Sequence, residues 1–196
     1  NTSNVTDMRY MFDDATSFNG DVSGWDIADV NGCMYMFRDA TSFEGIGLET
    51  WDLSGSTIIT GMFSGTTSLT ADISGWDVSN VTTFQSLFHN SNFNGDISSW
   101  DVSSATNTKY MFYLNTSFNQ DLLDWDVSNV TSMQAMFQSS PFNGDISSWD
   151  VSGTYVMKHM FYDNDAFDQD ISSWDVSNVS DWTGIFDNAD AISDEN

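Results

Sequence analysis

A ten-residue segment recurs along the chain, and this repetition constrains the fold more than any other feature of the sequence. NGDISSWDVS spans residues 94–103 and returns at residues 143–152, with looser copies beginning at Asn19, Thr70 and Asn119. Tryptophans recur every 24 to 26 residues, at Trp25, Trp51, Trp76, Trp100, Trp125, Trp149 and Trp174. A repeat of this length cannot bury its own apolar side chains, so successive copies must stack and share one core.

Two segments of each copy carry different apolar spacings. VTSMQAMF, residues 130–137, spaces Val130, Met133 and Phe137 by three and four residues, which predicts a short helical turn. GDISSWDV, residues 144–151, places apolar residues two or three apart next to Gly and Asn, which predicts a short strand with a bend. We therefore predict an α/β repeat solenoid with leucine-rich-repeat-like coils of 24–26 residues, each with one short parallel strand and one short helical turn.

These coils are expected to form a single domain over residues 1–196. The sequence accommodates about seven to eight copies, of which the first is truncated and the last, VSDWTGIFDNADAISDEN, is degenerate. The second copy, FEGIGLETW at residues 43–51, carries one extra residue between its Phe and its Trp.

The pattern FNxDISxWDVSNVTxMxxMF, found with variations along essentially the whole chain, resembles the BspA-like surface-protein repeat that also occurs in mycoplasma lipoproteins. The resemblance implies a leucine-rich-repeat-like solenoid on a cell surface or in a secreted protein. It also implies a role in adhesion to host matrix, other cells or biofilm rather than catalysis.

The charge of the chain limits its partners. A formal net charge of -25 comes from 29 acidic residues against four basic ones, which disfavours nucleic acids and anionic membrane surfaces. No apolar run approaches the roughly 20 residues of a membrane helix. The only cysteine, Cys33, excludes an internal disulfide and a multi-thiolate metal site, and its place in the repeat predicts a core residue.

Aspartate occupies two fixed positions around each tryptophan. The post-Trp aspartates directly follow it, at Asp26, Asp52, Asp77, Asp101, Asp126, Asp150 and Asp175. The pre-Trp aspartates lie four residues before it, at Asp21, Asp72, Asp96, Asp121, Asp145 and Asp170. Stacked coils would align like charges, which requires compensation either by backbone N–H groups or by a bound cation such as calcium. Capping is expected for the post-Trp aspartates, and the pre-Trp aspartates are the candidate calcium ligands.

Aromatic residues offer two further candidate surfaces. The tryptophans share the apolar rhythm of the repeat, so a buried core position is favoured over a sugar-stacking stripe. Four residues share the position two before the repeated Phe and are candidate partner-binding residues: Tyr10, Tyr35, Tyr110 and His159.

These patterns favour binding over catalysis. His89 and His159 stand in no nucleophile or metal-ligand motif, and no Gly-rich phosphate loop occurs. We predict a non-catalytic extracellular adhesion module that presents a regular acidic face to a protein or glycan on another cell or matrix. No cofactor is expected unless the aspartates bind calcium, and other repeats of a larger chain could be further partners. The alternative is a structural solenoid that uses its Asp and Ser ladders to bind calcium, a mineral or ice.

Overall fold

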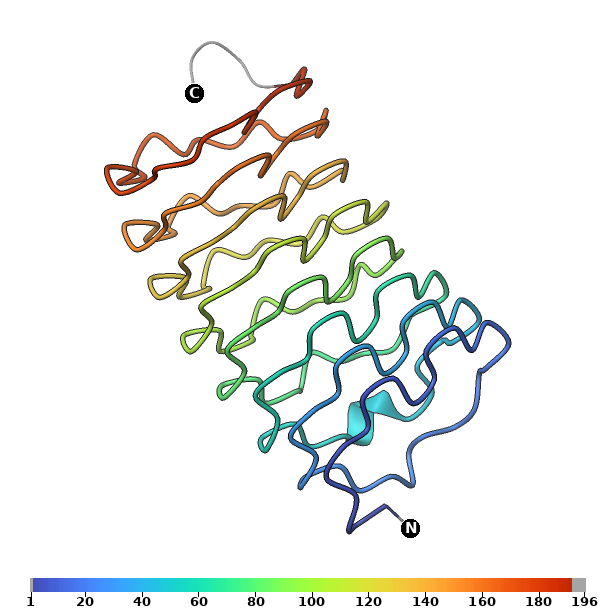
Figure 1. Ribbon diagram of the computed structural model, residues 1–196. Helices are drawn as coiled ribbons and strands as arrows, with labels where there is room; N and C mark the ends of the chain where they lie inside the picture. Colours follow the sequence, from blue (N-terminus) through green and yellow to red (C-terminus); the bar gives the residue numbers. More distant parts are fainter. Residues whose placement is uncertain (1, 192–196) are drawn as a thin grey trace.

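The computed structural model describes residues 2–191, which run as a series of coils stacked one upon the next (Figure 1). One residue of each coil forms an isolated parallel β-bridge with the corresponding residue of the next coil. The bridged positions are Asp7, Gly32, Ile58, Thr83, Asn107, Ser132, Val156 and Asp181. The sequence repeat therefore corresponds to one coil of the stack.

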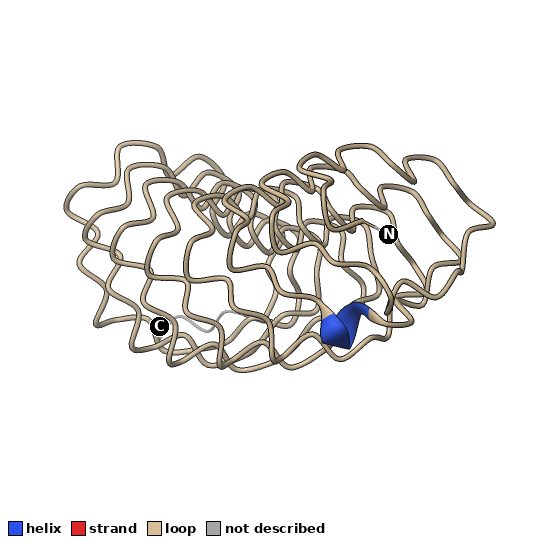
Figure 2. Cartoon of the chain, turned by 90° about the horizontal axis from the view of Figure 1, so that it is seen from below, coloured by secondary structure: helices blue, strands red, loops and turns tan. Residues whose placement is uncertain are grey.

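The predicted fold class, an α/β repeat solenoid with one short parallel strand and one short helical turn per coil, is wrong. Within residues 2–191 the only helix or strand is the 3-10 helix η1, Leu48–Thr50, and the remainder consists of turns and irregular backbone (Figure 2). Helix η1 lies in the irregular second copy, at the place where that copy carries its extra residue. No helix in the described part of the chain has the length and apolar content needed to cross a membrane.

The predicted helical turn is replaced by a segment whose N–H groups alternate between two targets. We call this the Met-Phe segment; in one coil it spans residues 108–115. Its even-numbered residues donate to carbonyls of the next coil, at N···O distances of 2.9–3.2 Å, whereas residues 111, 113 and 115 donate to the carbonyl three residues earlier. Only half of the N–H groups are thus satisfied locally, and a continuous helix is excluded.

Left-handed residues enforce this alternation. In the same segment Tyr110 and Leu114 have φ angles of 58° and 56°, and the corresponding positions of every other Met-Phe segment also have positive φ. Because an α-helix cannot continue through a left-handed residue, apolar side chains spaced by three and four residues reach the core from consecutive turns instead.

The predicted strand is also replaced by turns. The N–H of Trp149 donates to the carbonyl of Ile146, and the N–H of Thr154 donates to the carbonyl of Val151, at 3.2 and 2.9 Å. Two turns within nine residues leave no stretch long enough for a strand.

Aromatic rings fill the interior of the stack in columns. One contains the repeated Phe, one contains the repeated Trp, and a further set of phenylalanines stacks beside the first, as Phe118 does on Phe142 at 6.0 Å. Phenylalanines of successive coils stack at centroid distances of 5.4–6.0 Å, from Phe12 and Phe37 to Phe161 and Phe186. Five neighbouring tryptophan pairs stack at 6.2–6.5 Å. Cys33 is fully buried in this core, as predicted, and its burial raises the pKa of the thiol to about 11.

Each repeated tryptophan from Trp51 to Trp174 also joins two coils through a hydrogen bond. The indole Nε1–H of Trp100 donates to the carbonyl of Ile73 in the preceding coil at 3.1 Å, and Trp76 donates likewise to Leu48 at 2.8 Å. The side chains of Trp51 to Trp149 are at most 4% exposed. The predicted core position of the tryptophans is therefore confirmed, and the indole nitrogen explains why a purely apolar ring does not replace them.

The substitution Trp100→Phe tests the hydrogen bond. The phenyl ring stays in the column but leaves the buried Ile73 carbonyl without its donor, which should lower the free energy of unfolding by about 1–3 kcal/mol. Trp25→Phe is the matched control, because no indole hydrogen bond of Trp25 occurs within residues 2–191. Urea denaturation of both variants measures the difference, and equal losses would assign the effect to ring size alone.

Candidate functional site

The post-Trp aspartates cap a turn in every coil. Asp101 Oδ1 accepts hydrogen bonds from the backbone N–H of Ser103 at 3.0 Å and from its hydroxyl at 2.6 Å. All seven post-Trp aspartates accept the N–H two residues ahead, at 2.9–3.3 Å. The predicted capping role of these residues is confirmed.

The pre-Trp aspartates form the same contact. Asp21, Asp72, Asp96, Asp145 and Asp170 each accept the N–H two residues ahead at 2.8–3.0 Å. Asp121 differs, because its Oδ1 accepts the backbone N–H of Asp145 in the next coil at 2.8 Å. Apart from Asp121, the pre-Trp aspartates thus cap a turn as the post-Trp aspartates do, whereas the sequence analysis expected capping for the post-Trp aspartates.

A sequence signal for this shared role was present but was missed. Residues 145–149 read DISSW and residues 126–130 read DVSNV, so an Asp, an apolar residue and a Ser recur twice in most copies. In each case the carbonyl of the apolar residue accepts a hydrogen bond from the N–H three residues later, which closes a turn. The Asp before the apolar residue accepts the N–H of the serine inside that turn. This motif identifies both sets of aspartates as turn caps without any structure.

Hydrogen bonding stabilises the ionised form of these carboxylates. The hydroxyl and N–H of Ser74 hold the pKa of Asp72 below its ordinary value, and those of Ser103 act in the same way on Asp101. The N–H and then the hydroxyl of Ser98 lower the pKa of Asp96, while the nearby Asp72 opposes this shift. The hydrogen bonds that these carboxylates accept therefore lower their pKa values more than the repulsion between neighbouring aspartates raises them.

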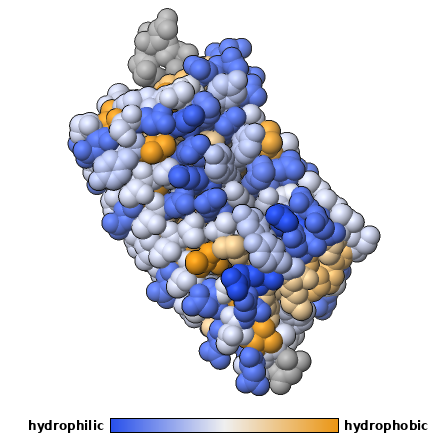
Figure 3. Space-filling model, viewed as in Figure 1, coloured by the Kyte–Doolittle hydropathy of each residue, from blue (hydrophilic) through white to orange (hydrophobic). Residues whose placement is uncertain are grey.

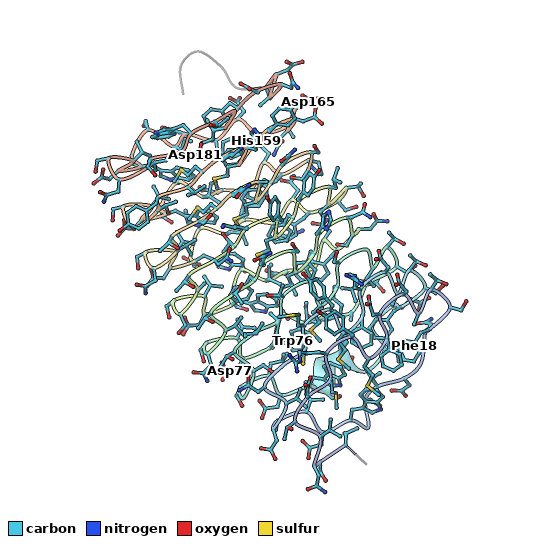
Figure 4. The ribbon with its side chains drawn as sticks, viewed as in Figure 1. Phe18, Trp76, Asp77, His159, Asp165 and Asp181 are labelled. Atoms are coloured by element: carbon cyan, nitrogen blue, oxygen red, sulfur yellow. The ribbon has the colours of Figure 1, made fainter. Side chains whose placement is uncertain are left out.

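The capped aspartates lie at the edge of the stack. Trp76 points into the interior and Asp77 lies at the outer edge (Figure 4). A hollow of about 370 Å³ lies at this edge and is lined by Asp101, Asp124, Asp126 and the serines Ser98 and Ser99. Only one oxygen of each post-Trp carboxylate is used by its cap, so the edge keeps negative charge available to a partner.

Residues 2–191 contain no cluster of three or more His, Cys, Asp or Glu side chains that could hold a metal ion. The six pre-Trp aspartates do not converge on one point but follow the stack, one per coil. Calcium binding by them stays a prediction.

The four candidate partner-binding residues occupy the first left-handed position of their Met-Phe segments, with φ between 54° and 61°. Tyr10 and Tyr35 stack at 5.4 Å, and the guanidinium of Arg38 lies 5.0 Å from the centre of the Tyr35 ring. A Cβ added to Gly61 would lie 2.2 Å from that ring, so Tyr35 covers the next coil.

Tyr110 and His159 do not join that pair. The hydroxyl of Tyr110 accepts a hydrogen bond from Gln134 at 2.7 Å, and the ring of His159 contacts Tyr162. In the two coils between Tyr35 and Tyr110, the same left-handed position holds the small residues Gly61 and Ser86. The predicted aromatic column is therefore interrupted, and only Tyr10 and Tyr35 form a continuous surface.

One aromatic pair was missed by sequence reasoning. His89 and Tyr113 directly follow the repeated Phe of adjacent coils, and their rings stack in parallel at 5.1 Å. His89 Nδ1 also lies 3.2 Å from the hydroxyl oxygen of Ser64, and burial lowers the pKa of the imidazole. The common offset from the repeated Phe is the signal that would have paired them.

Basic side chains are confined to the Met-Phe segments. Arg38 bonds Asp13 in the preceding coil at 2.6 Å, and Arg9 bonds Asp7 at 2.6 Å. Lys109 and Lys158, the remaining basic residues of the sequence, occupy the same part of the repeat. The edge formed by the aspartate-capped turns carries no basic residue, and hydrophilic residues cover most of the face shown in Figure 3.

The structure thus defines a repeat protein whose stacked coils are joined by backbone hydrogen bonds and aromatic columns. A family model matches residues 1–47, 44–141 and 123–196, and the chain belongs to this family, described as "Mycoplasma protein of unknown function, DUF285". Comparisons with curated proteins and with solved structures found no match.

Substitutions of Asp101 separate its cap from its charge. Asp101→Asn keeps an oxygen that accepts the Ser103 N–H, whereas Asp101→Ala removes it. We expect Asp101→Ala to lose about 1 kcal/mol of unfolding free energy and Asp101→Asn to lose less. Thermal and urea melts of both variants provide the measurement; an alanine variant as stable as the asparagine variant would contradict the capping role.

The lowered aspartate pKa values predict acid sensitivity. Carboxylates such as Asp72, Asp96 and Asp101 have folded-state pKa values below the ordinary 3.8, so their contribution to stability is present above that pH and is lost as the pH falls through the folded values. Urea midpoints measured from pH 7 to pH 2.5 at constant salt should therefore decrease below about pH 4. A rising midpoint would show that relief of charge repulsion dominates.

Proposed function

We propose that this chain is a non-catalytic adhesion module, displayed outside the cell, whose acidic edge binds a positively charged protein surface. Its repeat pattern resembles that of the BspA-like surface proteins, which supports an extracellular adhesive role. Its charge favours a basic partner over a neutral glycan.

The observation that carries this proposal is the way in which the edge carboxylates are held. The Oδ1 atom of each post-Trp aspartate is fixed by a backbone N–H, so the negative charges occupy defined positions before any partner arrives. A charged group that is already ordered loses little conformational entropy on binding. One such group per coil offers a partner many equivalent contacts.

The absence of basic residues from the aspartate-capped turns strengthens the argument. Arg9 and Arg38 lie in the Met-Phe segments and are paired with aspartates there, so they do not neutralise the acidic edge. A surface of one charge sign accelerates association with an oppositely charged partner, and salt weakens this effect.

A poly-lysine surface tests the proposal with two matched triple variants. Asp77→Asn, Asp101→Asn and Asp126→Asn together remove three edge charges while keeping the capping oxygens. Asp14→Asn, Asp39→Asn and Asp163→Asn remove three charges from left-handed positions of the Met-Phe segments, which asparagine tolerates well. We expect the edge variant to bind several-fold more weakly and with a smaller salt dependence than the control variant.

If both triple variants bound poly-lysine equally weakly, net charge alone would account for the binding, and the proposal would be overturned. Measurement with and without 5 mM calcium adds a second comparison. Calcium could raise the melting temperature of the wild-type chain but not that of a chain whose pre-Trp aspartates are changed to asparagine. The pre-Trp aspartates would then be calcium ligands, and the calcium-binding function would replace the adhesive one.

A further inference from the structure

A ladder of asparagine side chains joins most pairs of adjacent coils on one side of the stack. The ladder position directly follows the second repeated Phe of each copy, or Leu69 in its place. Its members are Asn19, Glu44, Thr70, Asn94, Asn119, Asn143 and Asp168. At four of the six steps between them, an asparagine Oδ1 accepts the backbone N–H of the next ladder residue, at N···O distances of 2.6–3.0 Å. The asparagine thus closes the gap between two coils.

Thr70 interrupts this ladder. At the step before it, the backbone carbonyl of Glu44 accepts the N–H of Thr70 at 3.1 Å, so those two coils are still joined. At the step after it, the N–H of Asn94 and the hydroxyl of Thr70 form no hydrogen bond within the described part of the chain. Residues 70–94 lie well inside the stack, away from both of its ends (Figure 1). The interruption is therefore a local property of this pair of coils.

A hollow of about 260 Å³ lies at the interruption, and no charged residue lines it. Its lining residues are Leu69, Thr70, Ala71, Asn92, Phe93, Asn94 and Gly95. Leu69 and Phe93 are buried and supply apolar surface, whereas Thr70 and Asn94 are exposed and supply polar groups. Because the equivalent N–H groups of other coils point at the preceding coil, the N–H of Asn94 points toward Thr70. Apolar surface beside a few convergent polar groups is the usual composition of a small-ligand site.

The charge around the hollow selects an uncharged ligand. Asp72 and Asp96 directly follow the lining residues Ala71 and Gly95, and these two carboxylates disfavour an anion. The free N–H of Asn94 is a donor, so it disfavours a cation and calls for an acceptor oxygen. A neutral molecule with hydroxyl oxygens and apolar C–H surface meets both conditions.

We propose that this hollow binds one hexose unit of a neutral glycan. One sugar hydroxyl accepts the N–H of Asn94, a second bonds the hydroxyl of Thr70, and the C–H surface of the ring packs on Leu69 and Ala71. Sites for drug-sized ligands begin at about 300 Å³, so the hollow takes a single sugar ring rather than a longer ligand. The site is separate from the acidic edge and does not depend on the basic partner proposed for it.

Saturation-transfer NMR tests the proposal. The probes are the methyl glycosides of glucose, galactose and mannose, and the methyl glycoside of glucuronic acid is the anionic comparison. The wild-type chain should transfer saturation to at least one of the neutral glycosides. Transfer to the glucuronic acid glycoside should be several-fold weaker, because Asp72 and Asp96 repel its carboxylate.

The substitution Thr70→Asn gives the sharpest comparison. Asparagine supplies the acceptor that is present at the other steps, so a hydrogen bond within the protein replaces the one made to the sugar. This variant should lose the neutral glycoside signal, while its melting temperature stays at or above that of the wild-type chain. Thr131→Asn is the matched control, because Thr131 is exposed and lies outside the hollow, and it should bind as the wild-type chain does.

Thr70→Val is a second variant that does not depend on a new hydrogen bond. Valine keeps the size of the side chain and leaves the hollow open, but it removes the hydroxyl, so binding should weaken several-fold. The proposal is overturned if no neutral glycoside binds the wild-type chain, if either Thr70 variant binds as the wild-type chain does, or if Thr131→Asn loses binding to the same extent. Binding of poly-lysine to the same samples reports on the acidic edge, so failure of one proposal is distinguishable from failure of the other.

Discussion

The hydrogen bonds between consecutive coils are the constraint on which the rest of this structure depends. A coil here contains neither a complete helix nor a strand, so its backbone groups cannot be satisfied within the coil. In each Met-Phe segment half of the N–H groups need carbonyls from the next coil, as the bonds from Tyr110 and Phe112 to the following coil illustrate. Because an unpaired buried amide is costly, one coil is stable only beside another.

Stacking of the coils also brings the negative charges of the repeat close together. Stacking places an aspartate of each coil near the equivalent aspartate of the next, and the resulting repulsion acts between Asp72 and Asp96. Serine N–H and hydroxyl groups offset this repulsion locally, while aromatic rings stabilise the contact from within. The charge is thus a consequence of the repeat, and it is left at the edge of the stack, where a partner can use it.

Repetition in the sequence was sufficient to predict the stack, its buried tryptophans and the capping of the turns that follow them. Those features depend on which residues recur at which interval, and the interval is visible in the printed sequence. The local conformation was predicted wrongly, because the spacing of Val130, Met133 and Phe137 fits a helix as well as consecutive turns. The left-handed backbone at Ala135 and Ser139 decides for consecutive turns. Neither residue is a glycine, so the sequence gives no sign of this conformation.

The candidate sites divide in the same way. By itself the sequence determined the composition of the acidic edge, because Asp follows every repeated Trp and basic residues occur only in the Met-Phe segments. Only the tertiary structure decided that the Tyr column is interrupted after Tyr35 and that His89 lies against Ser64 and Tyr113. These contacts depend on how adjacent coils are aligned, and that alignment is set by backbone hydrogen bonds rather than by the identity of any single residue.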